Sequence, residues 1–226
     1  MEADWEIEIG GGAPVIDALW PGFVDLRKSP ERIGEITEAS QFPALAHLLE
    51  ALNGADSPLW TAKCDIWKPE AAGLCIPATA SMKTKGQELI QSDLASLEAL
   101  PPGDSLSVLA CYIDLLPVES KVFVDWRQAE NFCREWIARL GQIQSSLPSL
   151  APALLPEGCV ESGLELIVRQ AIAGEKEGFG VTAYLSATGQ NKGPVSVEAA
   201  LISAMKNFAA TIPTTVPPAT VASKLQ

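Results

Sequence analysis

The chain of 226 residues contains a single histidine, His47, and no cysteine pair at the spacing of a metal site or redox motif. One histidine excludes a zinc site with several histidine ligands, and it restricts any Ser-His-Asp or Cys-His catalytic site to one built around His47. The five cysteines are odd in number and widely spaced, which favours buried reduced thiols. Because His47 flanks the apolar stripe of a short helix pattern, we interpret it as structural.

Long apolar runs and basic clusters are also lacking. The longest apolar runs are far shorter than the roughly 20 residues of a membrane helix, so we expect no membrane association. The chain opens with acidic residues where a signal peptide would be basic, and we expect a cytoplasmic protein. Nowhere do basic residues cluster with aromatic ones, so nucleic acid is a poor partner.

A glycine run, Gly10 to Gly12, follows a strand pattern near the start of the chain. Phosphate-binding loops have such runs, but here no lysine follows and the flanking residues are acidic. The sequence therefore predicts no nucleotide loop, and no other motif indicates a cofactor or a metal.

The surplus of acid is regional. Residues 1–143 hold 22 Asp and Glu against 11 Lys and Arg, whereas residues 158–226 hold five of each kind. Within residues 1–70 the ratio is 13 to 5. A negative field of this kind attracts basic protein surfaces and repels phosphate backbones. Surplus carboxylates also serve solubility, and this alternative stays open.

The clearest local pattern lies between Cys159 and Thr211. Apolar and polar residues alternate over 160–172 and again over 179–187, with a polar turn between, which predicts an antiparallel hairpin. Ser196 can cap a following helix, 196–211, whose apolar residues recur every three or four positions. The apolar stripe of that helix should cover one face of the hairpin.

Earlier in the chain the same rules predict further elements. Asp125 should cap the strongest helix, which has Trp136 on its apolar face. Asn53 and Gly54 should close a short helix in a left-handed conformation. The other expected elements are a first strand with an acidic outer face (5–9), a hairpin of Val15–Leu19 with Phe23–Arg27 around Trp20–Gly22, helices at 43–52, near 86–100 and at 126–143, strands at 59–67 and 106–115, and a long loop over 69–85.

These elements together predict an α+β fold. We expect two layers, a mainly antiparallel sheet covered by amphipathic helices. The shared element order of the two halves also favours two strand-strand-helix units sharing one sheet. Residues 1–212 should form a single domain, with halves 1–143 and 158–212 joined by a proline-rich connector over 144–157. Residues 213–226 should form an extended or mobile tail. A homo-oligomer is an open alternative to a monomer.

Two functional hypotheses follow. The first is a non-enzymatic acidic binding protein, such as an inhibitor, an immunity-type protein or an adaptor, that presents Glu6, Glu8, Asp17 and Asp25 to a basic protein partner. The second is a small carboxylate-dependent enzyme, with or without a divalent metal, that uses acids on or beside apolar strands. Its candidate residues are Asp17, Asp25, Asp65 and Asp114.

Overall fold

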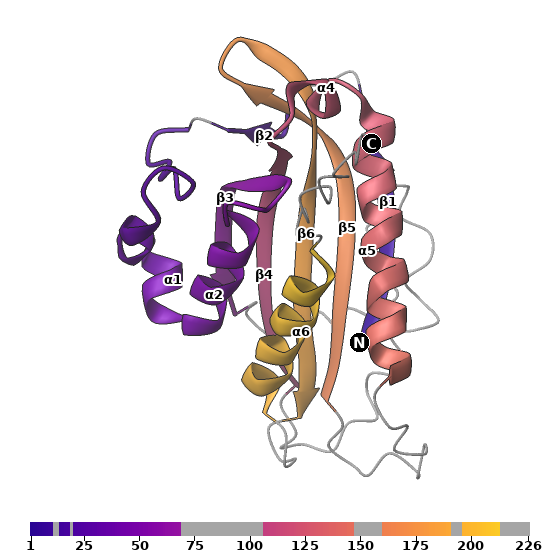
Figure 1. Cartoon of the computed structure of the whole chain (residues 1–226). Coiled ribbons are helices and arrows are strands. Elements are labelled where there is room, and N and C mark those ends of the chain that lie inside the picture. Colours follow the sequence, from indigo (N-terminus) through magenta and orange to yellow (C-terminus); the bar gives the residue numbers. More distant parts are fainter. Residues whose placement is uncertain (11–13, 19, 69–105, 147–159, 191–195, 213–226) are drawn as a thin grey trace, which may run out of the picture.

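A six-stranded mixed sheet forms the centre of the molecule. The structure, a computed structural model, describes residues 1–10, 14–18, 20–68, 106–146, 160–190 and 196–212 (Figure 1). The strand order is β1-β5-β6-β4-β3, and β2 also pairs with β5. The strands are β1 (Glu2–Glu8), β2 (Ile16–Asp17), β3 (Leu59–Trp67), β4 (Leu106–Pro117), β5 (Val160–Ala173) and β6 (Lys176–Gln190). Since β3, β4, β6 and β5 pair antiparallel, the prediction of a mainly antiparallel sheet in an α+β fold is confirmed.

Helices cover one face of this sheet, which we call the helix face. Figure 1 shows α2, α6 and α5 in front of the strands, each running roughly along them. The described helical elements are η1 (Pro30–Glu35), α1 (Thr37–Gln41), α2 (Pro43–Leu52), α4 (Ser120–Phe123), α5 (Trp126–Ser146) and α6 (Val197–Thr211). Trp136 and Phe208 are fully buried where α5 and α6 meet the sheet. As predicted, Ser196 caps α6 by accepting from Ala199 N at 3.0 Å.

The two halves of the chain share the sheet. In chain order β3 and β4 with α5 form one strand-strand-helix unit, and β5 and β6 with α6 form the other; in space α5 packs on β1, β5 and β6. The two units join where β4 pairs with β6, from Leu106↔Gln190 to Leu115↔Val181. The first strand, β1, then adds to the outer side of β5 and runs parallel to it, from Glu2↔Gly163 to Glu8↔Arg169.

The predicted hairpin of Val15–Leu19 with Phe23–Arg27 is wrong. Ile16 and Asp17 form β2, which pairs parallel with β5, and residues 23–27 contain no strand. The turn after Trp20 does exist, since Phe23 N donates to Trp20 O at 3.0 Å and Gly22 has a φ of 109°. Ile16 is fully buried in a second apolar cluster with residues of β3, β4 and β5. Burial of Ile16 against the sheet, and not pairing with residues 23–27, decides the path of this segment.

The alternation in β3 changes phase at a bulge. The register with β4 shifts between Thr61 and Lys63, so Ala62 is an extra residue in the strand. Before the bulge, Trp60 points to the side opposite the helices, and after it Lys63 does so. The sequence pattern placed Trp60, Ala62, Cys64 and Ile66 on one face, and this is wrong for the first two. Cys64 does pack against the main core, as expected.

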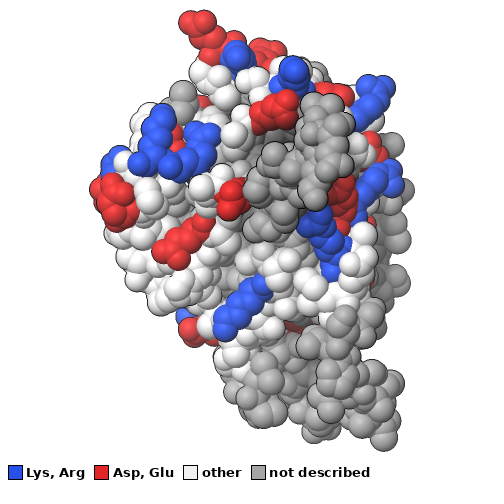
Figure 2. Space-filling view, viewed as in Figure 1, with Lys and Arg blue, Asp and Glu red and all other residues white. Residues whose placement is uncertain are grey.

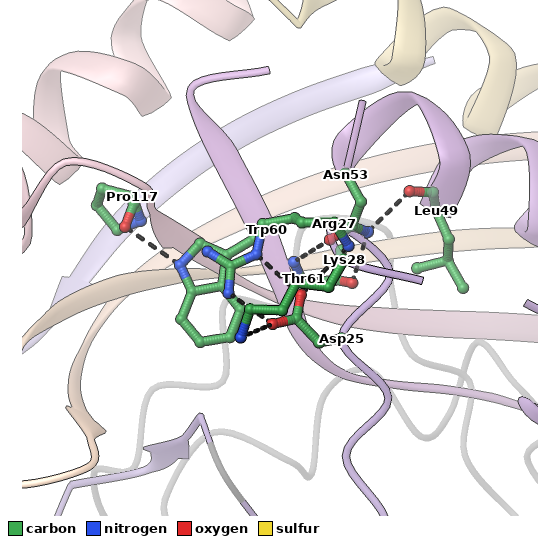
Figure 3. A network of polar contacts seen from close by, with 8 residues as sticks. All are labelled: Asp25, Arg27, Lys28, Leu49, Asn53, Trp60, Thr61 and Pro117. Atoms are coloured by element: carbon green, nitrogen blue, oxygen red, sulfur yellow. Dashed lines mark hydrogen bonds and ion pairs between the residues drawn. The ribbon is translucent and has the colours of Figure 1, made fainter. Parts of the chain in front are cut away.

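Asn53 ends α2 without a left-handed cap. Its φ of −103° and ψ of 6° lie outside that region, so this prediction is wrong. Its buried side chain instead ties the helix to β3, since Nδ2 donates to Leu49 O and to Thr61 Oγ1, both at 2.8 Å (Figure 3). Asn53 Oδ1 accepts from Thr61 N at 3.1 Å. Hydrogen bonding to the neighbouring strand replaces the local turn.

Several predictions lie outside the described residues. These are the loop over 69–85, the helix near 86–100, most of the connector over 144–157 and the tail 213–226. In the part of the chain that the structure describes, no helix is long and apolar enough to cross a membrane.

Candidate functional site

Polar side chains gather on the face of the sheet opposite the helices, which we call the polar face. The strand registers align them in rows that cross the sheet. One row runs from β1 to β3 through Asp4, Glu165, Tyr184, Tyr112 and Asp65. The next row consists of Glu6, Ile167, Thr182, Asp114 and Lys63, and a third begins with Glu8 and Arg169. The polar face therefore brings together acids, cations and tyrosines from strands far apart in the sequence.

Four carboxylates form what we call the acidic stripe at the β1 side of this face: Asp4, Glu6, Glu8 and Glu165. Asp4, Glu6 and Glu8 alternate along β1, and Glu165 lies on β5 directly opposite Asp4. Partial burial raises the pKa of Glu165, and the nearby Glu6 and Asp4 raise it further. Burial is the larger cause, and the repulsion from Glu6 and Asp4 adds to it.

Arg169 borders the stripe and opposes part of its charge. Its Nη2 forms an ion pair with Glu8 Oε2 at 2.7 Å, and its Nε donates to the same oxygen at 2.8 Å. Its Nη1 donates to Tyr184 Oη at 3.0 Å. One positive guanidinium therefore offsets only one of the four carboxylate charges, and the stripe keeps a net negative charge.

A pocket of about 280 Å³ lies beside the stripe, and we call it the sheet pocket. It is lined by two carboxylates, two cations, three aromatic residues and one valine: Asp17, Asp114, Lys63, Arg169, Trp20, Tyr112, Tyr184 and Val15. Asp114 is buried, and its Oδ1 accepts from Thr182 Oγ1 at 2.6 Å. Burial raises the pKa of Asp114, although the bond from Thr182 and the charges of Arg169 and Lys63 act in the opposite direction.

Lys63 lies close to Tyr112 within this pocket. Its interaction with Tyr112 raises the pKa of Lys63, whereas burial raises the pKa of Tyr112 against the effect of the lysine. The ammonium also lies 5.7 Å from the centroid of the Trp20 ring and 6.0 Å from that of Tyr112. The β3 bulge makes this arrangement, because without the extra residue Lys63 would point toward the helices.

The sequence-predicted acids are only partly brought together. Glu6 and Glu8 lie in the acidic stripe, while Asp17 and Asp114 line the sheet pocket. Asp65 lines a neighbouring pocket of about 290 Å³. Asp25 lies apart from the acidic stripe and is held by Arg27 at 3.1 Å and by Lys28 at 3.1 Å (Figure 3).

Asp25 has a structural task in this position. It orients Arg27, whose guanidinium carbon lies 4.0 Å from the centroid of the Trp60 ring. Burial raises the pKa of Asp25, but the bonds from Arg27 and Lys28 outweigh it, and the net change is downward. Its carboxylate is therefore already neutralised within the chain.

Reactive thiols and metal clusters do not add to this site. Burial raises the pKa of both Cys64 and Cys133 to about 12, so these thiols remain protonated and poorly nucleophilic at neutral pH. Among the residues that the structure describes, no three His, Cys, Asp or Glu side chains are arranged to hold a metal ion.

The sequence did not single out Lys63, Tyr112, Arg169 and Tyr184 as site residues. Alternation placed Lys63, Arg169 and Tyr184 on the outer faces of their strands, whereas Tyr112 lies on a strand that is apolar on both faces and gives no such signal. Their meeting depends on the order β5-β6-β4-β3 and on the β3 bulge. Both features arise from long-range pairing that local periodicity does not encode.

Replacing Glu165 with glutamine should stabilise the protein at neutral pH. The folded state raises the pKa of this carboxyl, so stability falls as the pH rises from the unfolded value near 4.3 through the raised one. E165Q removes that loss, and its stabilisation should vanish below about pH 4. Urea midpoints of parent and variant, measured at pH 7 and again below about pH 4, check this. A variant that is less stable at pH 7 would show that holding this carboxylate partly buried beside Asp4 and Glu6 is not a net cost.

Comparison with protein-family models, curated proteins and solved structures found no match to this chain.

Proposed function

We propose that this chain is a non-enzymatic binding protein that docks a basic segment of another protein on the polar face, with the acidic stripe as its centre. The observation that carries the proposal is the unbalanced charge of the stripe, where Glu165 has a raised pKa beside Asp4 and Glu6. A partner that supplies lysine or arginine there removes this repulsion.

The neighbouring tyrosines suit the same kind of partner. Tyr184 and Tyr112 continue the row of Asp4 and Glu165 across the sheet, and their ring centroids are 6.0 Å apart. Lysine and arginine side chains bind carboxylates and also lie on aromatic faces. This face already holds cations of its own in that way, since the guanidinium carbon of Arg169 lies 5.6 Å from the centroid of the Tyr184 ring.

The helix side of the molecule presents a different surface. Figure 2 shows acidic and basic side chains interspersed there, with uncharged surface between them. Several of these charges pair within a helix, as Arg134 does with Glu130 at 2.6 Å. Mutual pairing leaves less field to attract a partner, so the charge pattern favours the polar face.

The alternative of a carboxylate-dependent enzyme has less geometric support. Its four candidate acids are divided among the sheet pocket, the neighbouring pocket and the Trp60 region. Asp114 is the one with a raised pKa. A single such carboxyl fits binding as well as it fits catalysis, and the polar face as a whole carries the surplus of acid.

Association with the basic partner should be strongly salt-dependent. Exposed charges attract over a screening length of about 8 Å at physiological salt, so raising the salt should slow association far more than dissociation. Neutralising two members of the stripe, E6Q/E8Q, should have the same effect as added salt. The measurement is surface-capture kinetics with the partner obtained by affinity capture from the native cell.

The matched control is E50Q/E135Q, which removes two exposed carboxylates from α2 and α5. It should leave the association rate near that of the parent. An association rate that ignores both salt and E6Q/E8Q, or that falls equally in the control, would contradict docking at the acidic stripe.

A further inference from the structure

The sheet pocket contains charged groups of both signs that the docking proposal does not use. Lys63 and Arg169 approach it from β3 and β5, and Asp114 approaches it from β4 between them. A pocket of about 280 Å³ is smaller than those that hold drug-sized ligands, so its occupant must be a small molecule.

Two phenol groups supply hydrogen-bond donors. The oxygen of Tyr184 accepts from Arg169 Nη1 at 3.0 Å, and the ammonium of Lys63 lies beside Tyr112, 6.0 Å from the centroid of its ring. A phenol oxygen that accepts from a cation keeps its own proton for donation. Among the described residues, neither the Tyr112 nor the Tyr184 hydroxyl donates a hydrogen bond to an acceptor. Their ring centroids lie 6.0 Å apart, and both tyrosines line the sheet pocket together with Lys63 and Arg169.

A group of opposite charge can bind at Asp114. Thr182 bonds one oxygen of this carboxylate at 2.6 Å, and the residue lines the pocket beside Lys63. Asp17, from β2, adds a second carboxylate to the lining. An ammonium group on the ligand would form charge-assisted hydrogen bonds with the Asp114 carboxylate.

The wall of the pocket is preformed. The indole Nε1 of Trp20 donates to Ala62 O at 2.9 Å, which fixes the ring over β3. Gly22 permits this position, because a Cβ there would come within 2.7 Å of the Trp20 ring. Ile16 holds the start of the same segment against the sheet at Gly180, where a Cβ would meet Leu115 O at 2.6 Å. Little ordering is therefore left for the ligand to impose.

From this geometry we infer that the sheet pocket binds a small zwitterion of the α-amino acid class. Tyr112 and Tyr184, with Lys63 and Arg169 behind them, receive its carboxylate, and Asp114 receives its ammonium group. The inference goes beyond the docking of a basic segment, because it concerns a different ligand and a pocket whose key groups are not in the acidic stripe.

The test uses amide NMR chemical shifts of the full chain titrated with three probes. Glycine carries both charges, acetate carries the anion alone, and glycinamide carries the cation alone. Glycine should produce saturable shifts at Lys63, Tyr112 and Arg169, with an affinity about tenfold or more above that of either other probe, because one charge-assisted hydrogen bond accounts for about that factor.

Two variants separate the two ends of the ligand. Y184F keeps the ring and should weaken glycine and acetate about tenfold while sparing glycinamide, whereas D114N should weaken glycine and glycinamide while sparing acetate. S186A, on the same face of β6, is the control and should change nothing. The inference is overturned if glycine causes no saturable shift at the pocket, if the three probes bind equally, or if Y184F and D114N behave like S186A. Partner docking is measured separately, so either proposal can fail alone.

Discussion

Replacing Trp136 with alanine should lower the free energy of unfolding by about 3 to 5 kcal/mol. The side chain is fully buried where α5 meets α6 and the sheet. Its ring stacks on Phe132 at 5.7 Å and meets the edge of Phe208 at 5.8 Å. Removing it leaves a cavity that rigid neighbours fill only in part, and a loss of this size threatens a domain of ordinary stability. Urea unfolding of parent and variant measures it.

Trp136→Phe is the matched variant. Among the described residues, the indole Nε1 of Trp136 is the one buried side-chain nitrogen or oxygen without a hydrogen-bond partner. Phenylalanine removes this polar group and keeps an aromatic ring, so the two effects offset each other and the change should stay under about 1.5 kcal/mol. If W136A and the parent unfold at the same urea concentration, α5 does not turn Trp136 toward the sheet as described.

Replacing Asn53 with alanine should lower the free energy of unfolding by about 1 to 3 kcal/mol, because the backbone N–H of Thr61 loses its acceptor. The cavity that the smaller side chain leaves adds to this loss. The Asn53 side chain makes three hydrogen bonds between α2 and β3 (Figure 3). Alanine cannot accept the hydrogen bond that the buried backbone N–H of Thr61, in β3, donates to Asn53 Oδ1. Leu49 O is less affected, since it still accepts from the backbone N of residue 53 at 3.0 Å.

Thr61→Val is the control for this network. It removes only the hydroxyl that accepts from Asn53 and should cost less than N53A. N53D should cost at least as much as N53A, because it loses both donors and buries a carboxylate against Leu49 O. The folded state raises the pKa of that new carboxyl, so its deficit should narrow as the pH falls. Equal stabilities of N53A and the parent would contradict the network.

Local rules predict much of the fold. Alternation predicted the strands now seen as β3, β5 and β6, an apolar run on both faces predicted β4, and a three-to-four-residue repeat predicted α5 and α6. Caps were predictable where a single side chain satisfies its own helix, as Ser196 and Asp125 do. Each of these features depends on residues close together in the sequence.

The failures have a common physical cause. The β3 bulge and β2 are decided by partners far along the chain, the bulge by pairing with β4 and β2 by burial of Ile16 against Ala171. Asn53 is decided by Thr61, eight residues on but in the neighbouring strand. The pocket is subject to the same limit, because its residues come from β2, β3, β4, β5, β6 and the Trp20 turn. No single segment carries its signature.

The central claim is that the polar face is the working surface, and a lysine-reactivity footprint with the captured partner tests it most directly. Lys63 is exposed on the polar face, while Lys206 is exposed on α6 on the helix side. Partner binding should protect Lys63 from acylation and leave Lys206 as reactive as in the free protein, with less protection in E6Q/E8Q. Protection of Lys206 with Lys63 unchanged would contradict the claim and place the partner on the helices.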